Sequence, residues 1–120
     1  MRVIRLSDLE PTVSDSPIFA GAVQRCPIVD EGMASLLRLA LVRFSPGART
    51  VLHTHSHDQV LVVTEGRGVL ATETAENQVE PGAVIFVPAG ERHWHGAAAD
   101  SWFAHLSIVT PGRTELHQTG

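Results

Sequence analysis

The stretch Gly47-Ala-Arg-Thr-Val-Leu-His53-Thr-His55-Ser-His57-Asp-Gln59 places His53 and His55 two residues apart, with an amide side chain four residues after His55. A second stretch, Pro88-Ala-Gly90-Glu-Arg-His93-Trp-His95, supplies further imidazoles after a Pro/Gly turn. On a β-strand, residues i and i+2 point to the same face, so His53 and His55 can converge on one point. Neutral imidazole is the commonest protein ligand of divalent transition metals. The two stretches therefore predict a metal ion held inside a β-structure.

Short apolar runs surround these stretches and are separated by turn residues. The runs cover residues 36–44, 59–64, 68–72, 83–87 and 102–109. Gly, Pro, Asn or Asp lies between them, as at Ser45-Pro-Gly47 and Pro81-Gly82. Short strands at regular spacing with such turns predict an antiparallel sandwich or barrel. Residues 30–41 can also be read as a helix, although residues 36–44 fit a buried strand at least as well.

The spacing of the two histidine stretches resembles that of the cupins, which are small double-sheet β-barrels that bind divalent metals. Gly47-x5-His53-x-His55-x3-Gln59-x6-Gly66 follows the first cupin motif, and Gly82-x5-Pro88-x-Gly90-x2-His93 follows the second. The resemblance covers residues 40–110. It implies an all-β fold, a small double-stranded β-helix that forms a jelly-roll-like antiparallel barrel.

This fold divides the chain of 120 residues into three parts. Residues 1–35 are broken by prolines and are expected to form an arm of extended pieces and edge strands that packs on the barrel. Residues 36–112 form the barrel itself. Residues 113–120 are polar and are expected to form a loosely ordered tail.

A closer resemblance, to the bacterial cupin-type hydroxynitrile lyases, is carried by three strings. They are Pro46-Gly-Ala-Arg-Thr50-Val-Leu-His53-Thr-His55 with Gln59, His93-Trp-His95-Gly-Ala-Ala, and Ala104-His105-Leu106. Those enzymes depend on manganese and cleave or form cyanohydrins. The chain departs from them at Val109, where the lyases carry a polar amide, and at His57, where they are less polar.

Several site residues follow from this resemblance. It implies one divalent metal ion, with manganese favoured over iron, zinc or nickel, and the ligands His53, His55, Gln59 and His93. It also implies His105 as a base close to the metal and Thr50 as a hydroxyl in the pocket. The remaining residues of the substrate pocket are expected to be Ala40, Val42, His95, Phe103 and Val109.

Gln59 is the main departure from the general cupin pattern, in which this position usually carries Glu. The change removes one negative charge from the ligand set, so a dication held by three imidazoles and an amide keeps its full charge. Such an ion is a stronger Lewis acid and is harder to oxidise, which favours polar chemistry over dioxygen activation. The alternative is that Gln59 points away and that the metal has only three protein ligands.

The other histidines have both functional and structural interpretations. His95 is either a partner that orients a ligand, a proton relay or a rim residue beside Trp94. His57 fits a solvated turn better than a ligand position. His105 lies in an apolar run, where a histidine is often a satisfied core residue. Strand alternation, however, places it with Phe103 and Ser107 on one face, and a neutral imidazole near a dication is suited to act as a general base.

Composition limits the partners of the chain. The formal net charge is −4, and the nine basic residues are all arginines that are scattered singly, which argues against nucleic acid and anionic membranes. The absence of lysine excludes Schiff-base chemistry. The single cysteine, Cys26, is expected to be a buried, inert thiol. The N-terminus lacks the apolar stretch of a signal peptide, so a cytoplasmic protein is expected. A homodimer is expected as well, because a small barrel leaves an apolar edge that a second copy can cover.

Three functions remain open at this point. The favoured one is a metal-dependent enzyme that acts on a small polar organic substrate by Lewis-acid and base catalysis, with hydroxynitrile-lyase chemistry as its best-defined form. The second is an iron-dependent dioxygenase that uses the same ligands. The third is a non-catalytic cupin that binds or senses a small molecule.

Overall fold

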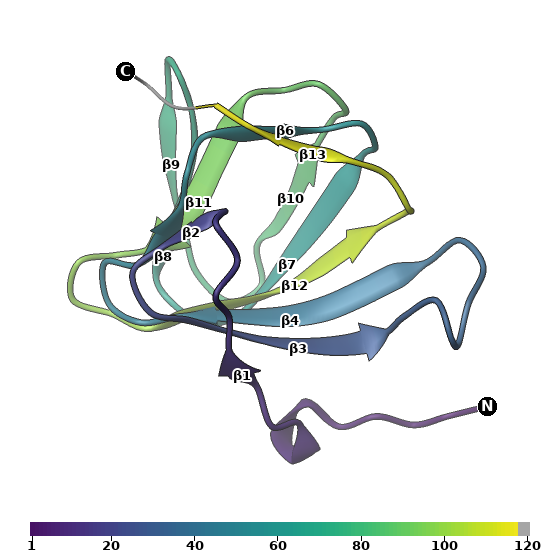
Figure 1. Cartoon of the computed structure of the whole chain (residues 1–120). Helices are drawn as coiled ribbons and strands as arrows, with labels where there is room; N and C mark the ends of the chain where they lie inside the picture. The colour runs from purple at the N-terminus through teal and green to yellow at the C-terminus, as the bar shows by residue number, and fades with distance from the viewer. Residues whose placement is uncertain (118–120) are drawn as a thin grey trace.

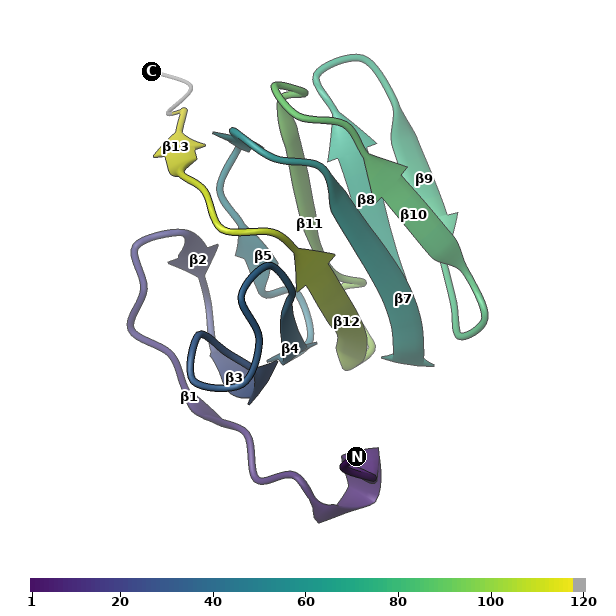
Figure 2. The same ribbon diagram turned by 90° about the vertical axis from the view of Figure 1, so that its right-hand side faces the viewer.

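Two antiparallel sheets curve around a common interior in the computed structural model, which describes residues 1–117 (Figures 1 and 2). The first sheet has six strands, in the order β1 (Thr12–Val13), β3 (Val23–Val29), β4 (Arg38–Phe44), β12 (Phe103–Val109), β7 (Gln59–Gly66) and β10 (Val84–Val87). The seven strands of the second sheet are β13 (Thr114–Leu116), β6 (His53–His55), β11 (His93–Ala97), β5 (Arg49–Thr50), β2 (Phe19–Ala20), β8 (Gly68–Thr72) and β9 (Glu76–Val79). The prediction of an all-β antiparallel barrel is confirmed.

The apolar runs of the sequence become the central strands. The run 68–72 matches β8, and the runs that lead into β4, β10 and β12 each begin one or two residues before the strand does. Residues 38–44 are a strand and not a helix, because β4 is paired on both sides, with β3 and with β12. Within residues 1–117 the only helix is a 3-10 turn at Leu6–Asp8, and no helix there is long and apolar enough to cross a membrane.

The hydrophobic core lies between the sheets at one end of the barrel. Phe44, Leu61 and Phe103 are fully buried, and the Phe44 and Phe103 rings lie 5.9 Å apart. Burying each such side chain stabilises the fold by about 1.5–3 kcal/mol. Gly66 closes the turn between β7 and β8 with a φ of 69°, and a Cβ there would clash with the carbonyl oxygen of Trp102. Only glycine fits this position.

A second apolar cluster lies on the outer face of the six-stranded sheet. Ile28, Leu41 and Ala104 are buried there, and Leu9 from the N-terminal arm packs against them. Cys26 is half-buried beside this cluster, which makes it less buried than predicted. The alternation predicted for residues 103–108 is visible in β12, because Phe103 faces the core whereas Ala104 faces this outer cluster.

Both ends of the chain are more regular than the sequence suggested. Within the predicted arm, β3 is a full strand of the six-stranded sheet and pairs with β1 and β4. Its Pro27 lies beyond the part of β3 that pairs with β1 and next to an irregularity in the register with β4, which are positions where a strand tolerates proline. The predicted tail differs too, since β13 pairs with β6 in register from Thr114 to Leu116. Residues 118–120 of that tail lie outside the described residues.

Candidate metal centre

Three histidines from two neighbouring strands meet in the interior of the barrel. His53 and His55 share one face of β6, and the antiparallel register places His93 of β11 directly opposite His53. The candidate ligand atoms of the three rings all lie within 4.8 Å of one another. Because metal–imidazole bonds are about 2.0–2.1 Å long, ligand atoms on opposite sides of one ion are separated by about 4 Å. The three rings therefore lie near the spacing that one shared ion requires.

Hydrogen bonds fix the orientation of each ring. The Nδ1 of His53 donates to the Val51 carbonyl at 2.8 Å, and the Nδ1 of His93 donates to the Glu91 carbonyl at 2.9 Å. Because a carbonyl only accepts, both rings carry their proton on Nδ1 and present the Nε2 lone pair. The Nδ1 of His55 lies 2.9 Å from the Thr114 hydroxyl oxygen, which can accept in the same way.

Gln59 presents a fourth candidate ligand atom. Its Nε2 donates to the Ser107 hydroxyl at 2.9 Å, which leaves Oε1 without a hydrogen-bond partner among residues 1–117. The same is true of the Nε2 atoms of His53, His55 and His93. A buried polar atom without a partner costs about 1–3 kcal/mol. Four such atoms, three imidazole nitrogens and one amide oxygen, form a donor set that fits a divalent transition metal.

The local electrostatics keep the three rings neutral. The pKa of His53 is lowered to about 3, mainly by burial and in part by the neighbouring His93. Burial is also the main cause that lowers the pKa of His55 to about 4, whereas the nearby Gln59 side chain acts in the opposite direction. The pKa of His93 is lowered by burial as well. All three imidazoles therefore have free lone pairs at neutral pH.

His95 and His105 form a second, fully buried histidine pair. The His105 Nε2 lies 3.0 Å from the His95 Nδ1, and the backbone N–H of His95 donates to the Thr50 hydroxyl at 3.1 Å. Burial lowers the pKa of His105 to about 4 and that of His95 well below its ordinary value of 6.5. The Nδ1 of His105 has no hydrogen-bond partner in the described part of the chain. In the tautomer in which the His105 Nε2 donates to His95, this Nδ1 carries the lone pair and is available to take up a proton.

This pair lies directly beside the three converging rings. The His95 ring stacks parallel to the His93 ring, with centroids 5.8 Å apart, and lies 5.6 Å from the His53 ring. The His95 ring thus lies between the three rings and His105. Of the interpretations open for His95, the structure matches a buried partner and not a rim residue.

The burial of neutral imidazoles predicts that the metal-free protein is sensitive to acid. Four of the histidines, His53, His93, His95 and His105, are at most 4% exposed. Below the ordinary pKa of 6.5 the unfolded chain binds protons that the folded chain refuses, so stability falls as the pH drops towards the lowered pKa values. Within this window, each such histidine lowers the free energy of unfolding by about 1.4 kcal/mol for each unit by which the pH falls.

We therefore expect the melting temperature of metal-free protein to fall steeply between about pH 6.5 and about pH 4. Scanning calorimetry over this range measures it. Metal-loaded protein serves as the control, because an ion that binds only the folded state raises stability and delays the loss. A melting temperature that stays constant as the pH falls through this window would contradict the account.

A cavity of about 530 Å³ adjoins the Gln59 side of the candidate site. Its lining includes Ser107, which accepts the Gln59 hydrogen bond, and also Ala40, Val109 and His57. Two predicted pocket residues, Ala40 and Val109, thus line this cavity, whereas none of the four predicted ligands does. His57 stacks on the His55 ring at 4.9 Å but does not join the three-histidine group.

Two other predicted pocket residues, Val42 and Phe103, belong to the hydrophobic core. Phe103 is fully buried and packs edge-on against His105 at 5.7 Å. Their contact with a substrate stays a prediction.

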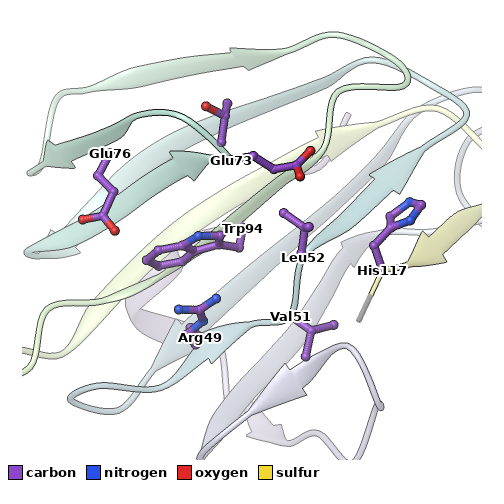
Figure 3. Close-up of a pocket in the computed structure, with 8 residues that line it drawn as sticks. Arg49, Val51, Leu52, Glu73, Glu76, Trp94 and His117 are labelled. Carbon is purple, nitrogen blue, oxygen red and sulfur yellow. The ribbon is translucent and has the colours of Figure 1, made fainter. Parts of the chain in front are cut away.

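A larger cavity of about 610 Å³ lies on the outer face of the seven-stranded sheet (Figure 3). Trp94 points out of the barrel there, opposite to its neighbours His93 and His95, and the Arg49 guanidinium lies 3.8 Å from its ring centre. Glu73 and Glu76 contribute carboxylates to the rim. None of the predicted ligands or pocket residues lines this cavity, so it is separate from the candidate metal centre.

Sequence reasoning assigned no role to Ser107 or Thr114, which orient Gln59 and His55. Strand alternation in residues 103–109 places Ser107 on the inner face, and this pattern could have identified Ser107 as a residue of the site. No local pattern marks Thr114, because its role depends on the pairing of β13 with β6.

Comparisons with known proteins agree with this geometry. A family model described as "Cupin domain" matches residues 40–109. The chain is 42% identical over 91 residues to an (R)-mandelonitrile lyase from Granulicella tundricola. The aligned region covers 75% of this chain and 70% of the lyase. A cupin-like protein from Thermotoga maritima superposes with a TM-score of 0.85 and 33% identity over 92% of this chain and 87% of that one. A polyketide cyclase from Streptomyces resistomycificus, at 21% identity, shares the fold with a TM-score of 0.83 over 99% of this chain and 88% of that one. The chain belongs to the cupin family.

Proposed function

We propose that this protein is a metal-dependent lyase that cleaves or forms cyanohydrins. Its metal ion would be divalent, with manganese expected, and held by His53, His55, Gln59 and His93. One observation carries the proposal: hydrogen bonds orient these four side chains so that each directs a buried, unpartnered donor atom inward. The likeness to a mandelonitrile lyase supports the choice of reaction.

The neutral ligand set favours Lewis-acid chemistry. Three imidazoles and an amide bring no negative charge to the ion, so a bound dication would keep its full charge and would polarise an oxygen of the substrate strongly. A carboxylate at position 59 would offset part of that charge. The structure therefore supports polar bond cleavage over an oxygen-activating role.

The chain supplies the base. With its Nε2 donating to the Nδ1 of His95, neutral His105 would present the lone pair of its unpartnered Nδ1 to the hydroxyl proton of a cyanohydrin. As the C–C bond to the nitrile breaks, its electron pair leaves with cyanide and the oxygen becomes a carbonyl. Cyanide then takes the proton from protonated His105 and leaves as hydrogen cyanide. Thr50, which holds the His95 backbone, would orient the substrate oxygen.

Cyanide release from mandelonitrile tests this reaction. We expect manganese-loaded protein to release cyanide and benzaldehyde, and metal-stripped protein to show only the background rate. A loaded protein that releases no cyanide would overturn the lyase assignment. Oxygen uptake that depends on ferrous iron would then favour a dioxygenase, and a tightly held ligand without turnover would favour a binding module.

Gln59→Glu tests the role of the neutral ligand within the same assay. The added carboxylate should bind the ion more tightly and weaken it as a Lewis acid. We expect a higher affinity for manganese together with a kcat about tenfold lower, equivalent to about 1.4 kcal/mol in the barrier. Gln59→Leu, which offers no ligand atom, is the matched control and should lose affinity. A Gln59→Glu variant as fast as wild type would contradict the charge argument.

We also propose that the protein is a cytoplasmic homodimer. The outer face of β10 leaves Val84 65% exposed and Phe86 61% exposed, next to Val60 and Val62 of β7. Exposed apolar patches on a sheet of this kind mark interaction sites. A second copy of the chain would cover this face.

A further inference from the structure

The contacts that orient the histidines are of two kinds. His53 and His93 each donate from Nδ1 to a backbone carbonyl two residues earlier in the chain, at Val51 and Glu91. These partners are local and accept only, so the backbone just before β6 and β11 fixes both tautomers by itself. A side-chain substitution at Val51 or Glu91 would leave the carbonyl in place.

His55 is held differently. Its Nδ1 lies 2.9 Å from the hydroxyl oxygen of Thr114, which comes from β13, 59 residues away in the chain. The register of the two strands places Thr114 directly opposite His55. A hydroxyl can donate or accept, so His55 presents its Nε2 lone pair only when Thr114 acts as the acceptor. His55 is also the least buried of the three rings, with less packing to hold it.

We propose that Thr114 is a positioning residue of the metal centre. Its hydroxyl oxygen accepts the Nδ1 proton of His55, and this bond fixes both the tautomer and the ring orientation that direct Nε2 to the ion. The inference rests on the proposed metal site and extends it to a strand outside the two histidine motifs. Partners of this kind commonly change metal affinity by about 10- to 100-fold when they are removed.

The chain offers a matched control one residue away from His55. The Thr54 hydroxyl lies 2.9 Å from the His117 Nε2, so it also joins β6 to the C-terminal segment. Thr54 lies between two ligands on β6 but bonds to neither of them. Thr54→Val therefore removes a hydrogen bond between the same two segments without removing one from a ligand.

The experiment measures the dissociation constant for Mn²⁺ by competition with a chelator, using the full chain. We expect Thr114→Val to weaken binding by about 10- to 100-fold. Thr114→Ser, which keeps the hydroxyl, should stay within about threefold of wild type, and so should Thr54→Val. The measurement needs no turnover, so it does not depend on whether the protein is a lyase.

Two results would overturn the proposal. One is a Thr114→Val protein that binds Mn²⁺ as tightly as wild type. The other is a Thr54→Val protein that weakens binding as much as Thr114→Val, because β13 would then only hold β6 in place. Wild-type protein that binds no Mn²⁺ would overturn this inference and the proposed metal site together, whereas lost lyase activity with intact binding would affect only the reaction.

Should Thr114→Val fail to fold, nitrogen NMR of wild-type protein loaded with Zn²⁺ keeps the proposal testable. We expect the His55 ring to carry its proton on Nδ1 and the ion on Nε2. A proton on Nε2 or an ion on Nδ1 would contradict the role of Thr114.

Discussion

His93→Ala is expected to abolish stable metal binding and, with it, cyanide release. The substitution removes one of three converging imidazole nitrogens and leaves the His53 ring without the partner opposite it. The loss of a direct ligand should exceed the 10- to 100-fold loss typical of outer partners, so we expect an affinity for Mn²⁺ lower by well over about 100-fold. Elemental analysis after gel filtration and the mandelonitrile assay measure both effects.

His57→Ala is the matched control for this prediction. His57 belongs to the same histidine-rich segment and stacks on His55, but it does not join the three-histidine group. We expect this variant to retain the metal content of wild type. A His93→Ala protein that keeps its full metal content would contradict the ligand assignment.

His105→Gln is expected to slow cyanide release by about 10²- to 10⁴-fold, the usual contribution of a general base. Glutamine keeps a polar group beside His95 and much of the volume between Phe44 and Phe103, so the fold should survive. Its amide cannot take up a proton near neutral pH. Initial rates with saturating mandelonitrile measure the effect.

Metal content separates this role from a structural one. Because His105 bonds to His95 and none of its observed hydrogen bonds reaches a candidate ligand, the variant should bind manganese as wild type does. A His105→Gln protein that keeps the wild-type rate would show that another group is the base. One that loses its metal would assign His105 to the support of the metal centre.

The central strands could be predicted because their signal is local. Alternating burial in β7 follows the sequence from Gln59 onward, and Gly66 ends the run with a turn that only glycine can make. Strand β9 was missed because Glu76 and Asn77 are exposed and polar, as in a turn. Strand β13 was missed because it becomes a strand through pairing with the distant β6, whereas β3, expected only as an extended or edge piece, pairs with its chain neighbours β1 and β4.

The residues of the candidate site also divide into those that a local sequence pattern predicts and those that depend on contacts with distant segments. His53 and His55 could be predicted to converge because their spacing alone puts them on one face of a strand. The contacts of Gln59 with Ser107 and of His55 with Thr114 span 48 and 59 residues. Such contacts depend on which strands become neighbours, and no pattern near these residues encodes that.

The metal content of wild-type protein, purified without added metal, tests the central claim most directly. Elemental analysis should find about one divalent ion per chain, with manganese as the expected metal, because three converging imidazole nitrogens and the unpartnered Gln59 oxygen are a donor set suited to one ion. A protein that contains no metal, and that takes up none from solutions of manganese, iron, zinc or nickel, would contradict the claim that His53, His55, Gln59 and His93 form a metal centre.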